Sequence, residues 1–393
     1  MKKKVLFVID SLNSGGAEKS LISLLNAFNF DKYDVDLLLF SPRGLYLPQL
    51  PKEVKVLEVP NLFINMQEKI NRIVKNKSFK ELYIRLGISL SLRIPIYRKR
   101  MHKAQISWKW LSRGLENLKG SYDIAVAYSQ GTPTYYVAEK VVAKKKLCWV
   151  NTDYKLAPYN KHYDEKFYKQ YDHVIAVSDY NKNIFIKEMP IAKEKTVVIY
   201  DIISSKFIQS MACEPSCFND NYDGIKILTI GRLVEVKGYD LAIESCFKLK
   251  QNGIKFKWYV IGEGNLKKKL LKKIYKLGLD NIFILLGTQS NPYNYIKNSD
   301  IYVQTSRYEG FGLAIAEARM LNKPIVSTNF DTVYNQIVDG KNGIIVDMNS
   351  EAIAKGITKL IKDRELKEDI VENLHKEKKG NVQEINKLYE LIG

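Results

Sequence analysis

The chain has 393 residues, a length that corresponds to about two ordinary domains. Hydrophobic residues make up 46% of it and aromatic residues 11%, which is enough for a packed core and excludes a wholly disordered protein. Because 62 Lys and Arg stand against 43 Asp and Glu, the net charge is +19. Such an excess predicts a polyanionic partner: nucleic acid, an anionic membrane surface or a phosphorylated substrate.

The sequence predicts a cytoplasmic location. Its four cysteines lie at no zinc-like or thioredoxin-like spacing, which is typical of structural thiols in a reducing compartment. The first apolar run, Val5 to Ile9, ends at Asp10 and is too short for a signal peptide. No run approaches the roughly 18 apolar residues of a membrane-spanning helix. We expect a cytoplasmic protein, including peripheral association with the inner face of the plasma membrane.

Short apolar segments recur along the first half, with helical spacing over 16–28. The predicted strands there are Lys4–Ile9, Asp36–Phe40, Val54–Val59, Asp123–Tyr128, Lys146–Val150, Asp172–Val177 and Val197–Tyr200. Turn-forming residues cluster over 201–224, which predicts a linker. The first domain is therefore placed at 1–200.

The second half shows the same alternation more clearly. Strands are predicted at 225–230, 256–260, 282–286, 301–305, 324–327 and 343–346, and helices at 239–252, 265–277 and 313–321. This pattern is typical of a parallel sheet covered on both faces. We predict an α/β protein with two doubly wound domains, the second over 225–375. Residues 376–393 are expected to form a helix that packs back on the first domain.

Residues 66–113 carry a local excess of positive charge. They hold thirteen Lys and Arg against Glu68 and Glu81, and so account for nearly all of the first half's net charge. Ile70, Ile73 and Val74, followed by Leu82 and Leu86, recur at helical spacing. The segment is either a solvated helical face or a basic amphipathic surface that binds anionic lipid. Nucleic acid is disfavoured because no nucleic-acid motif accompanies the charge.

Two glycine-containing loops follow strands of the second half. The first loop is Gly231-Arg232-Leu-Val-Glu-Val-Lys237-Gly238. Its planar Arg232 guanidinium and compact Lys237 ammonium form a pair suited to binding a diphosphate at the edge of the sheet. The alternative is a loop with two ordinary surface cations.

The second loop is Ser306-Arg-Tyr-Glu309-Gly310-Phe311-Gly312-Leu313, and it opens the helix that contains Glu317. Its glycines let backbone approach a ligand, and the unpaired amides of a helix start favour phosphate. Glu309 and Glu317 are placed to flank an extended polar ligand such as a sugar nucleotide. Each carboxylate alone could equally be a loop charge or a helix-start charge.

These two loops, together with Gly15-Gly16-Ala-Glu-Lys19 after the first strand, resemble family 4 retaining glycosyltransferases of the GT-B fold, of the bacterial surface-polysaccharide type. The resemblance covers nearly the whole chain and is strongest from 225 to 375. It implies two Rossmann-like domains that face a central cleft.

The resemblance also implies roles. Arg232 and Lys237 would hold the donor diphosphate in place of a divalent metal, Glu309 would lie beside the donor sugar, and Glu317 would bind the ribose. The other donor-binding positions implied are Gly15, Gly16, Gly231, Gly262, Thr288, Gly310, Phe311, Gly312 and Leu313. No cofactor or metal is expected besides the nucleotide-sugar.

The sequence departs from the family at Asn151, where relatives often carry His. Asn can hydrogen-bond a sugar hydroxyl but cannot titrate, which makes a proton-handling role there doubtful. Gln130, Asn151 and Asp153 are candidates for contacts on the acceptor side, and local turn and cap hydrogen bonds are the alternative.

We therefore expect a retaining, metal-independent hexosyl- or N-acetylhexosaminyltransferase. It would move a sugar from a nucleotide donor, UDP-linked by expectation, to a glycan or lipid-linked saccharide in bacterial surface polysaccharide synthesis. A GT-B-fold epimerase or phosphorylase, and a non-catalytic nucleic-acid- or glycan-binding protein, are the alternatives. The remaining expected partner is an anionic membrane surface, bound through 66–113.

Overall fold

The computed structural model describes residues 2–13, 15–67, 79–95, 100–215, 218, 220, 222–377 and 379–393. Its chain divides into two compact units, which are described separately. Unit 1 contains residues 1–201 and 383–393, and unit 2 contains residues 202–382. None of the helices in these described ranges is long and apolar enough to cross a membrane.

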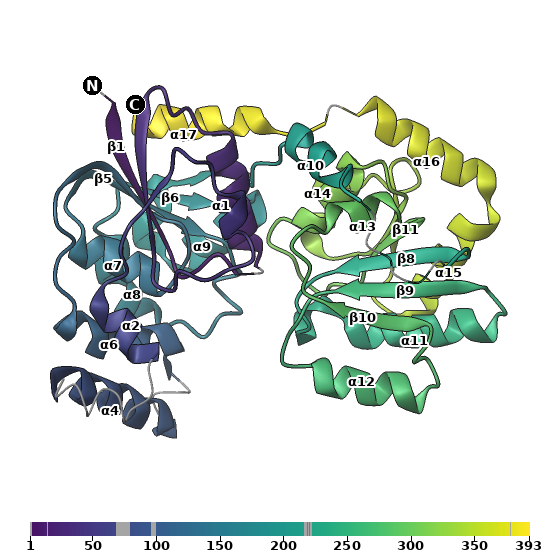
Figure 1. Cartoon of the computed structure of the whole chain (residues 1–393), viewed down its shortest axis with the longest axis horizontal. Coiled ribbons are helices and arrows are strands. Elements are labelled where there is room, and N and C mark those ends of the chain that lie inside the picture. The colour runs from purple at the N-terminus through teal and green to yellow at the C-terminus, as the bar shows by residue number, and fades with distance from the viewer. Residues whose placement is uncertain are drawn as a thin grey trace. The chain divides into compact units, whose positions relative to one another are not determined.

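Unit 1 is built on a parallel sheet of seven strands in the order β3-β2-β1-β4-β5-β6-β7 (Figure 1). The strands are β1 (Lys3–Ile9), β2 (Tyr33–Leu39), β3 (Lys55–Val56), β4 (Tyr122–Ala127), β5 (Ala143–Val150), β6 (His173–Ala176) and β7 (Thr196–Val198). The helices are α1 (Gly16–Asn26), α2 (Asn61–Gln67), α4 (Phe79–Arg93), α6 (Lys103–Gly114), α7 (Thr132–Lys140), α8 (Lys161–Tyr168), α9 (Asp179–Glu188) and α17 (Ile385–Ile392).

Alternating side chains of β1 pack on the two opposite faces of this sheet. Leu6 and Val8 belong to the core that α6 to α9 cover with large aromatic residues such as Trp108. Phe7 points the other way and meets Phe28, which in turn contacts Tyr389 of α17. The sheet is thus buried on both sides, and the near-continuous apolar run of β1 reflects that burial.

Unit 2 has a second parallel sheet, ordered β10-β9-β8-β11-β12-β13. The strands are β8 (Ile225–Ile230), β9 (Phe256–Ile261), β10 (Phe283–Gly287), β11 (Ile301–Gln304), β12 (Ile325–Thr328) and β13 (Ile344–Val346). The helices are α10 (Ser205–Ala212), α11 (Tyr239–Gln251), α12 (Lys267–Lys276), α13 (Tyr293–Lys297), α14 (Leu313–Met320), α15 (Ser350–Lys362) and α16 (Arg364–Lys376). Ile227 packs with α11, α12, α15 and α16, whereas its neighbour Leu228 packs with α10, α13 and α14. Both sheets therefore have the doubly wound arrangement that the sequence predicts.

The division of the chain differs from the prediction. Residues 202–215, placed in a linker by their turn-forming neighbours, belong to unit 2, because Ile203, Ile208 and Ala212 are buried in its core. The chain returns to unit 1 at Gln383 rather than at 376, since α16 continues to Lys376 within unit 2.

The basic segment 66–113 is helical where it is described: α4 and α6 cover most of it. Ile70, Ile73 and Val74 lie outside the described residues. Leu82 is half-buried, whereas Leu86 is exposed.

Candidate active site

The loop after β8 in unit 2 holds the first pair of predicted cations. Its backbone is fixed by Tyr239, whose hydroxyl donates to the carbonyl of Gly231 at 2.6 Å. Burial and the negative charge of Glu309 raise the pKa of Tyr239, so this hydroxyl stays a neutral donor. Arg232 is exposed beside it, while Leu233 is buried and anchors the loop.

Gly238 ends this loop and begins α11 in a left-handed conformation, with φ of 63°. A Cβ at that position would lie 2.0 Å from the carbonyl oxygen of Thr305, in the loop that follows β11. The hydroxyl of Thr305 donates to the carbonyl of Lys237 at 2.9 Å. The two glycine-containing loops predicted from the sequence therefore lie directly against each other.

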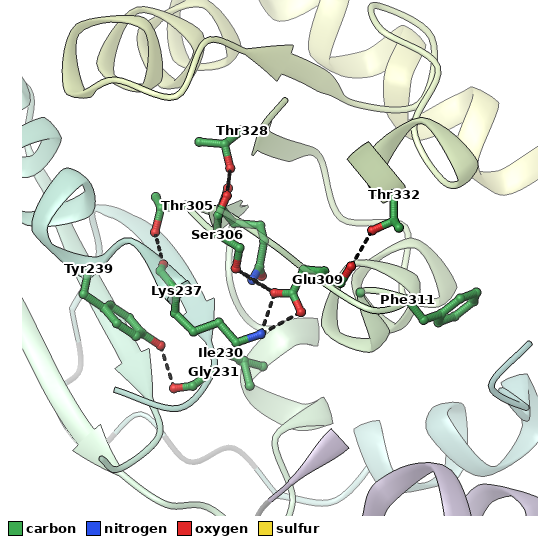
Figure 2. Close-up of polar contacts among 12 residues, drawn as sticks. Ile230, Gly231, Lys237, Tyr239, Thr305, Ser306, Glu309, Phe311, Thr328 and Thr332 are labelled. Carbon is green, nitrogen blue, oxygen red and sulfur yellow. Dashed lines mark hydrogen bonds and ion pairs between the residues drawn. The ribbon is translucent and has the colours of Figure 1, made fainter. Parts of the chain in front are cut away.

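Lys237 and Glu309 form an ion pair at this junction (Figure 2). The Lys237 ammonium lies 2.6 Å from both carboxylate oxygens of Glu309, and the two side chains are only 17% and 11% exposed. The Glu309 carboxylate also accepts hydrogen bonds from Gln304 at 2.8 Å and Ser306 at 2.6 Å. Because its acceptor positions are filled by neighbouring side chains, Glu309 acts in this conformation to position Lys237.

The loop leading into α14 is fixed from a third segment. The hydroxyl of Thr332 donates to the carbonyl of Glu309 at 2.9 Å, and the Gln336 amide donates to the carbonyls of Phe311 and Gly312. Gly312 has φ of 84° and precedes Leu313, the first residue of α14. The backbone N–H groups at the start of α14 are those that a phosphate could use.

Glu317 lies one turn into α14 and is 3% exposed. The hydroxyl of Tyr293 donates to its carboxylate at 3.3 Å. Gly262, which follows β9, comes so close to the neighbouring loop that a Cβ would lie 2.0 Å from the Gly231 carbonyl oxygen. Thr288 follows β10 and is exposed. All of these positions lie at the carboxyl edge of one sheet, where open parallel sheets bind their ligands.

Sequence reasoning missed several residues that shape this site. They are Gln304, Ser306, Tyr239, Thr332 and Gln336. One signal was available: Gln304, Thr305 and Ser306 put three polar residues in a row at the end of an otherwise apolar strand. Buried polar residues at a strand end require partners, and here those partners are the site itself.

Arg307, which lies in the predicted motif, turns away from the ion pair. Its guanidinium binds both carboxylate oxygens of Asp240, at 2.9 and 2.7 Å. This contact raises the pKa of Arg307 and ties the loop to the first turn of α11.

The acceptor-side candidates gather at the carboxyl edge of the unit 1 sheet. Gln130 accepts from the backbone and hydroxyl of Thr152 at 3.0 and 2.6 Å, and Asn151 donates to the Tyr128 carbonyl at 3.2 Å. The other polar atom of each amide, Gln130 Nε2 and Asn151 Oδ1, is buried without a protein partner in the described residues. One hydrogen-bond donor and one acceptor thus lack a partner among the described residues.

Asp153 behaves differently. It is 4% exposed, and its carboxylate accepts from the backbone N–H groups of Lys155 and Leu156 at 2.7 and 3.1 Å. These are the turn hydrogen bonds that were the alternative to an acceptor contact. Gly15 and Gly16, the remaining predicted donor-binding pair, lie in unit 1 at the start of α1.

Comparisons with known proteins identify glycosyltransferases among the sequences similar to this chain. Residues 218–377 match the family model for glycosyl transferases group 1. A Campylobacter jejuni enzyme named N-acetylgalactosamine-N,N'-diacetylbacillosaminyl-diphospho-undecaprenol 4-alpha-N-acetylgalactosaminyltransferase is 25% identical, over 93% of this chain and 92% of its own.

Two further relatives match over less of their length. An uncharacterized glycosyltransferase of Methanocaldococcus jannaschii is 28% identical, over 58% of this chain and 64% of its own. The capsular polysaccharide biosynthesis glycosyltransferase CapM of Staphylococcus aureus is 29% identical, over 51% and 55% respectively. The chain therefore spans less than two thirds of these two relatives.

Among solved structures, Anabaena HepE in complex with UDP-glucose superposes with a TM-score of 0.70 at 19% identity, over 99% of this chain and all of that one. TarM superposes with a TM-score of 0.67 at 16% identity, over 100% of this chain and 99% of that one. At these identities the likeness concerns the fold. Residues 218–377 are thus similar to the glycosyl transferases group 1, in a chain whose two Rossmann-like sheets have the GT-B architecture.

Proposed function

We propose that this protein is a retaining glycosyltransferase that moves a sugar from a UDP-linked donor to a glycan or lipid-linked saccharide of a bacterial surface polysaccharide. The observation that carries the proposal is the largely buried Lys237–Glu309 pair at the carboxyl edge of the unit 2 sheet, with the exposed Arg232 on the same loop as Lys237. An ammonium held by Glu309 and a guanidinium on the same glycine-containing loop suit a diphosphate.

In the reaction that the family resemblance implies, the bond between the anomeric carbon and a donor phosphate oxygen breaks. The acceptor hydroxyl oxygen forms the new bond on the same face of the sugar, and its proton passes to the leaving diphosphate. Negative charge therefore grows on the diphosphate in the transition state. Lys237 and Arg232 would stabilise that charge in place of a metal ion, and Glu309 would hold the ammonium in position for it.

The relatives support the choice of substrates. The Campylobacter enzyme that aligns over nearly the whole chain is named for a diphospho-undecaprenol-linked saccharide, and HepE has been solved with UDP, with UDP and glucose, and with UDP-glucose. We propose the same two substrate classes for this chain: a UDP-sugar as donor, and a saccharide carried on a polyprenyl diphosphate as acceptor. The buried amides of Gln130 and Asn151 are the groups proposed to bind sugar hydroxyls.

The test is a screen of UDP-, GDP- and ADP-sugars by thermal shift, followed by turnover with a polyprenyl-diphosphate saccharide. A ligand at tenfold its dissociation constant stabilises the folded state by about 1.4 kcal/mol, which is measurable. We expect stabilisation by a UDP-sugar and a product with the donor's anomeric configuration. An inverted product would contradict retention, and turnover of the donor without an acceptor would indicate an epimerase.

Variants of the two cations test the site itself. Lys237→Ala and Arg232→Ala should each lower kcat/KM by about 10²- to 10⁴-fold, because they remove charge stabilisation in the transition state. The matched control is Lys248→Ala, which breaks an exposed ion pair with Glu351 on the same unit and should keep full turnover. Near wild-type rates for Lys237→Ala would rule out the diphosphate assignment.

A further inference from the structure

Helix α4 of unit 1 has one face fixed against α6. Ile84 is 1% exposed, and Ser91 accepts a hydrogen bond from the indole N–H of Trp110 at 2.9 Å. A Cβ added at Gly87 would lie 2.5 Å from the Trp110 ring, so the two helices approach as closely as a glycine permits. Figure 1 shows α4 outside α6, at the margin of the unit. This packing fixes the rotation of α4 about its axis.

The rotation leaves an apolar stripe on the outside. Five large residues at spacings of four, three, four and four are exposed, by 76%, 59%, 49%, 59% and 42% in order: Phe79, Tyr83, Leu86, Leu90 and Ile94. They make up a third of the large hydrophobic residues exposed in the described part of the chain. Scattered exposed residues are ordinary on a soluble surface, but a continuous helical stripe marks an interaction site.

Positive charge predominates on α4 and α6. Residues 79–95 and 100–114 carry seven cations and one carboxylate: Lys80, Arg85, Arg93, Arg100, Lys103, Lys109 and Arg113 against Glu81. The Glu81 carboxylate accepts a hydrogen bond from Asn65 at 2.7 Å and so is partly engaged within the protein. Long basic side chains beside an apolar stripe can lie along it and place their charges at its border.

The positive charge favours an anionic lipid surface over a second copy of the chain as the partner of the stripe. A second copy docked face to face would bring two sets of seven cations together, and like charges across an interface oppose binding. An anionic lipid surface offers apolar acyl chains for the stripe and phosphate charges for its border. We infer that α4 is an interfacial helix that inserts Phe79, Leu86 and Leu90 into the surface of an anionic membrane.

The test is flotation of the purified chain with vesicles of phosphatidylcholine alone or mixed with phosphatidylglycerol. The wild type should float with the anionic vesicles and not with the neutral ones. Leu86→Gln with Leu90→Gln should lower partitioning by about tenfold or more, since two apolar side chains no longer leave water. Lys80→Gln with Arg93→Gln should lower it by about 25-fold, at roughly fivefold per charge near the surface.

The matched control lies on α12 in unit 2. Leu271 and Tyr275 are 46% and 77% exposed one turn apart on a helix that also carries six lysines, so Leu271→Gln with Tyr275→Gln changes a similar surface. That variant should float like the wild type, and every variant should keep the wild-type melting temperature. Loss of flotation in the α12 variant alone would overturn the inference, as would absence of wild-type binding to anionic vesicles.

Analytical ultracentrifugation without lipid tests whether a second copy of the chain, rather than a membrane, covers the stripe. We expect a monomer whose mass does not depend on the α4 substitutions. A dimer that dissociates in Leu86→Gln with Leu90→Gln, with no vesicle binding by the wild type, would assign the stripe to a second copy. None of these measurements requires the donor sugar, so their outcome is independent of the transfer reaction.

Discussion

Glycines set how closely the two loops of the candidate site can approach. Gly238 is buried, has a positive φ and lies against the Thr305 carbonyl, one residue from the ammonium that Glu309 holds. Gly253 has a similar φ of 70°, but a Cβ there would meet nothing within 4 Å. A side chain at Gly253 would meet only the free-energy cost of a left-handed backbone. A side chain at Gly238 would meet that cost and also the steric clash with the Thr305 carbonyl.

Gly253→Ala should lower the free energy of unfolding by about 1 kcal/mol, the usual penalty for a side chain in the left-handed region. Gly238→Ala should cost more than that and should also reduce kcat/KM by tenfold or more, because the loop that carries Lys237 must move. Thermal unfolding and donor turnover measure the two effects. Equal losses in both variants would show that the contact with Thr305 does not matter.

A buried carboxyl in unit 1 makes stability depend on pH. Ser20 donates to Asp201 at 2.5 Å and is hydrogen-bonded to the Tyr128 hydroxyl at 2.8 Å. Burial raises the pKa of Asp201 to about 7 against 3.8 for an ordinary aspartate, although the Ser20 hydrogen bond lowers it. The folded state therefore binds this proton more tightly than the unfolded state does.

The stabilisation from protonated Asp201 is full below about pH 4 and is lost as the pH rises through 7. Asp201→Asn keeps an acceptor for Ser20 and cannot ionise. Its melting temperature should therefore fall less between pH 4.5 and 7.5 than that of the wild type. Melting curves at several pH values provide the measurement, and parallel pH profiles for the two proteins would contradict it.

At the scale of elements, one carboxylate joins three helices of unit 1. Asp164 of α8 accepts from Gln105 of α6 at 2.6 Å, from Tyr135 of α7 at 2.8 Å and from Tyr154 at 2.5 Å. Burial raises its pKa even though all three hydrogen bonds lower it. The three donor residues are buried from solvent, so the carboxylate specifies how these helices pack.

Asp164→Ala should cost about 3 kcal/mol or more, since it removes the acceptor of two buried tyrosine hydroxyls and leaves the Gln105 amide with only the Asn160 carbonyl. Asp164→Asn keeps one acceptor oxygen and should cost less. The next residue provides the control: Glu165→Ala should change the free energy of unfolding by no more than about 0.5 kcal/mol. Urea unfolding of the three variants measures these changes. An unchanged free energy of unfolding in Asp164→Ala would refute the role assigned to this carboxylate.

At the scale of the whole chain, the C-terminal helix α17 packs on unit 1, the unit that the N-terminal residues form. Tyr389 of α17 stacks on Tyr33 at 5.6 Å between ring centroids, and the backbone N–H of Asn29 donates to its hydroxyl at 2.8 Å. Leu388 and Ile392 are buried beside it. The chain therefore passes between the units twice, after Asp201 and after Val382.

Deletion of residues 383–393 should destabilise unit 1 and leave unit 2 nearly unchanged. Hydrogen exchange followed by mass spectrometry distinguishes the two: protection should fall across β1 to β7 and persist across β8 to β13. Tyr389→Phe, which keeps the stacked ring, should behave almost as the wild type. Equal loss of protection in both sheets would contradict a local role for α17.

The sequence by itself determined the strands of both sheets and the loops at their carboxyl ends. Apolar runs and glycine-containing turns are local features, and a parallel sheet brings the ends of its strands to one edge. In the described residues, the seven strands of unit 1 and the six of unit 2 each overlap a predicted segment. The cations at 232 and 237 and the carboxylate at 309 could be singled out on the same grounds.

Only the tertiary structure decided the rest. Lys237 and Glu309 are 72 residues apart, and their pairing depends on β8 lying beside β11. Residues 202–215 belong to unit 2 because segments distant in sequence cover Ile203, Ile208 and Ala212. The same holds for α4: its composition offers apolar residues on more than one face, and contact with α6 determines which face remains exposed. Burial depends on contacts between distant segments, which a local pattern does not contain.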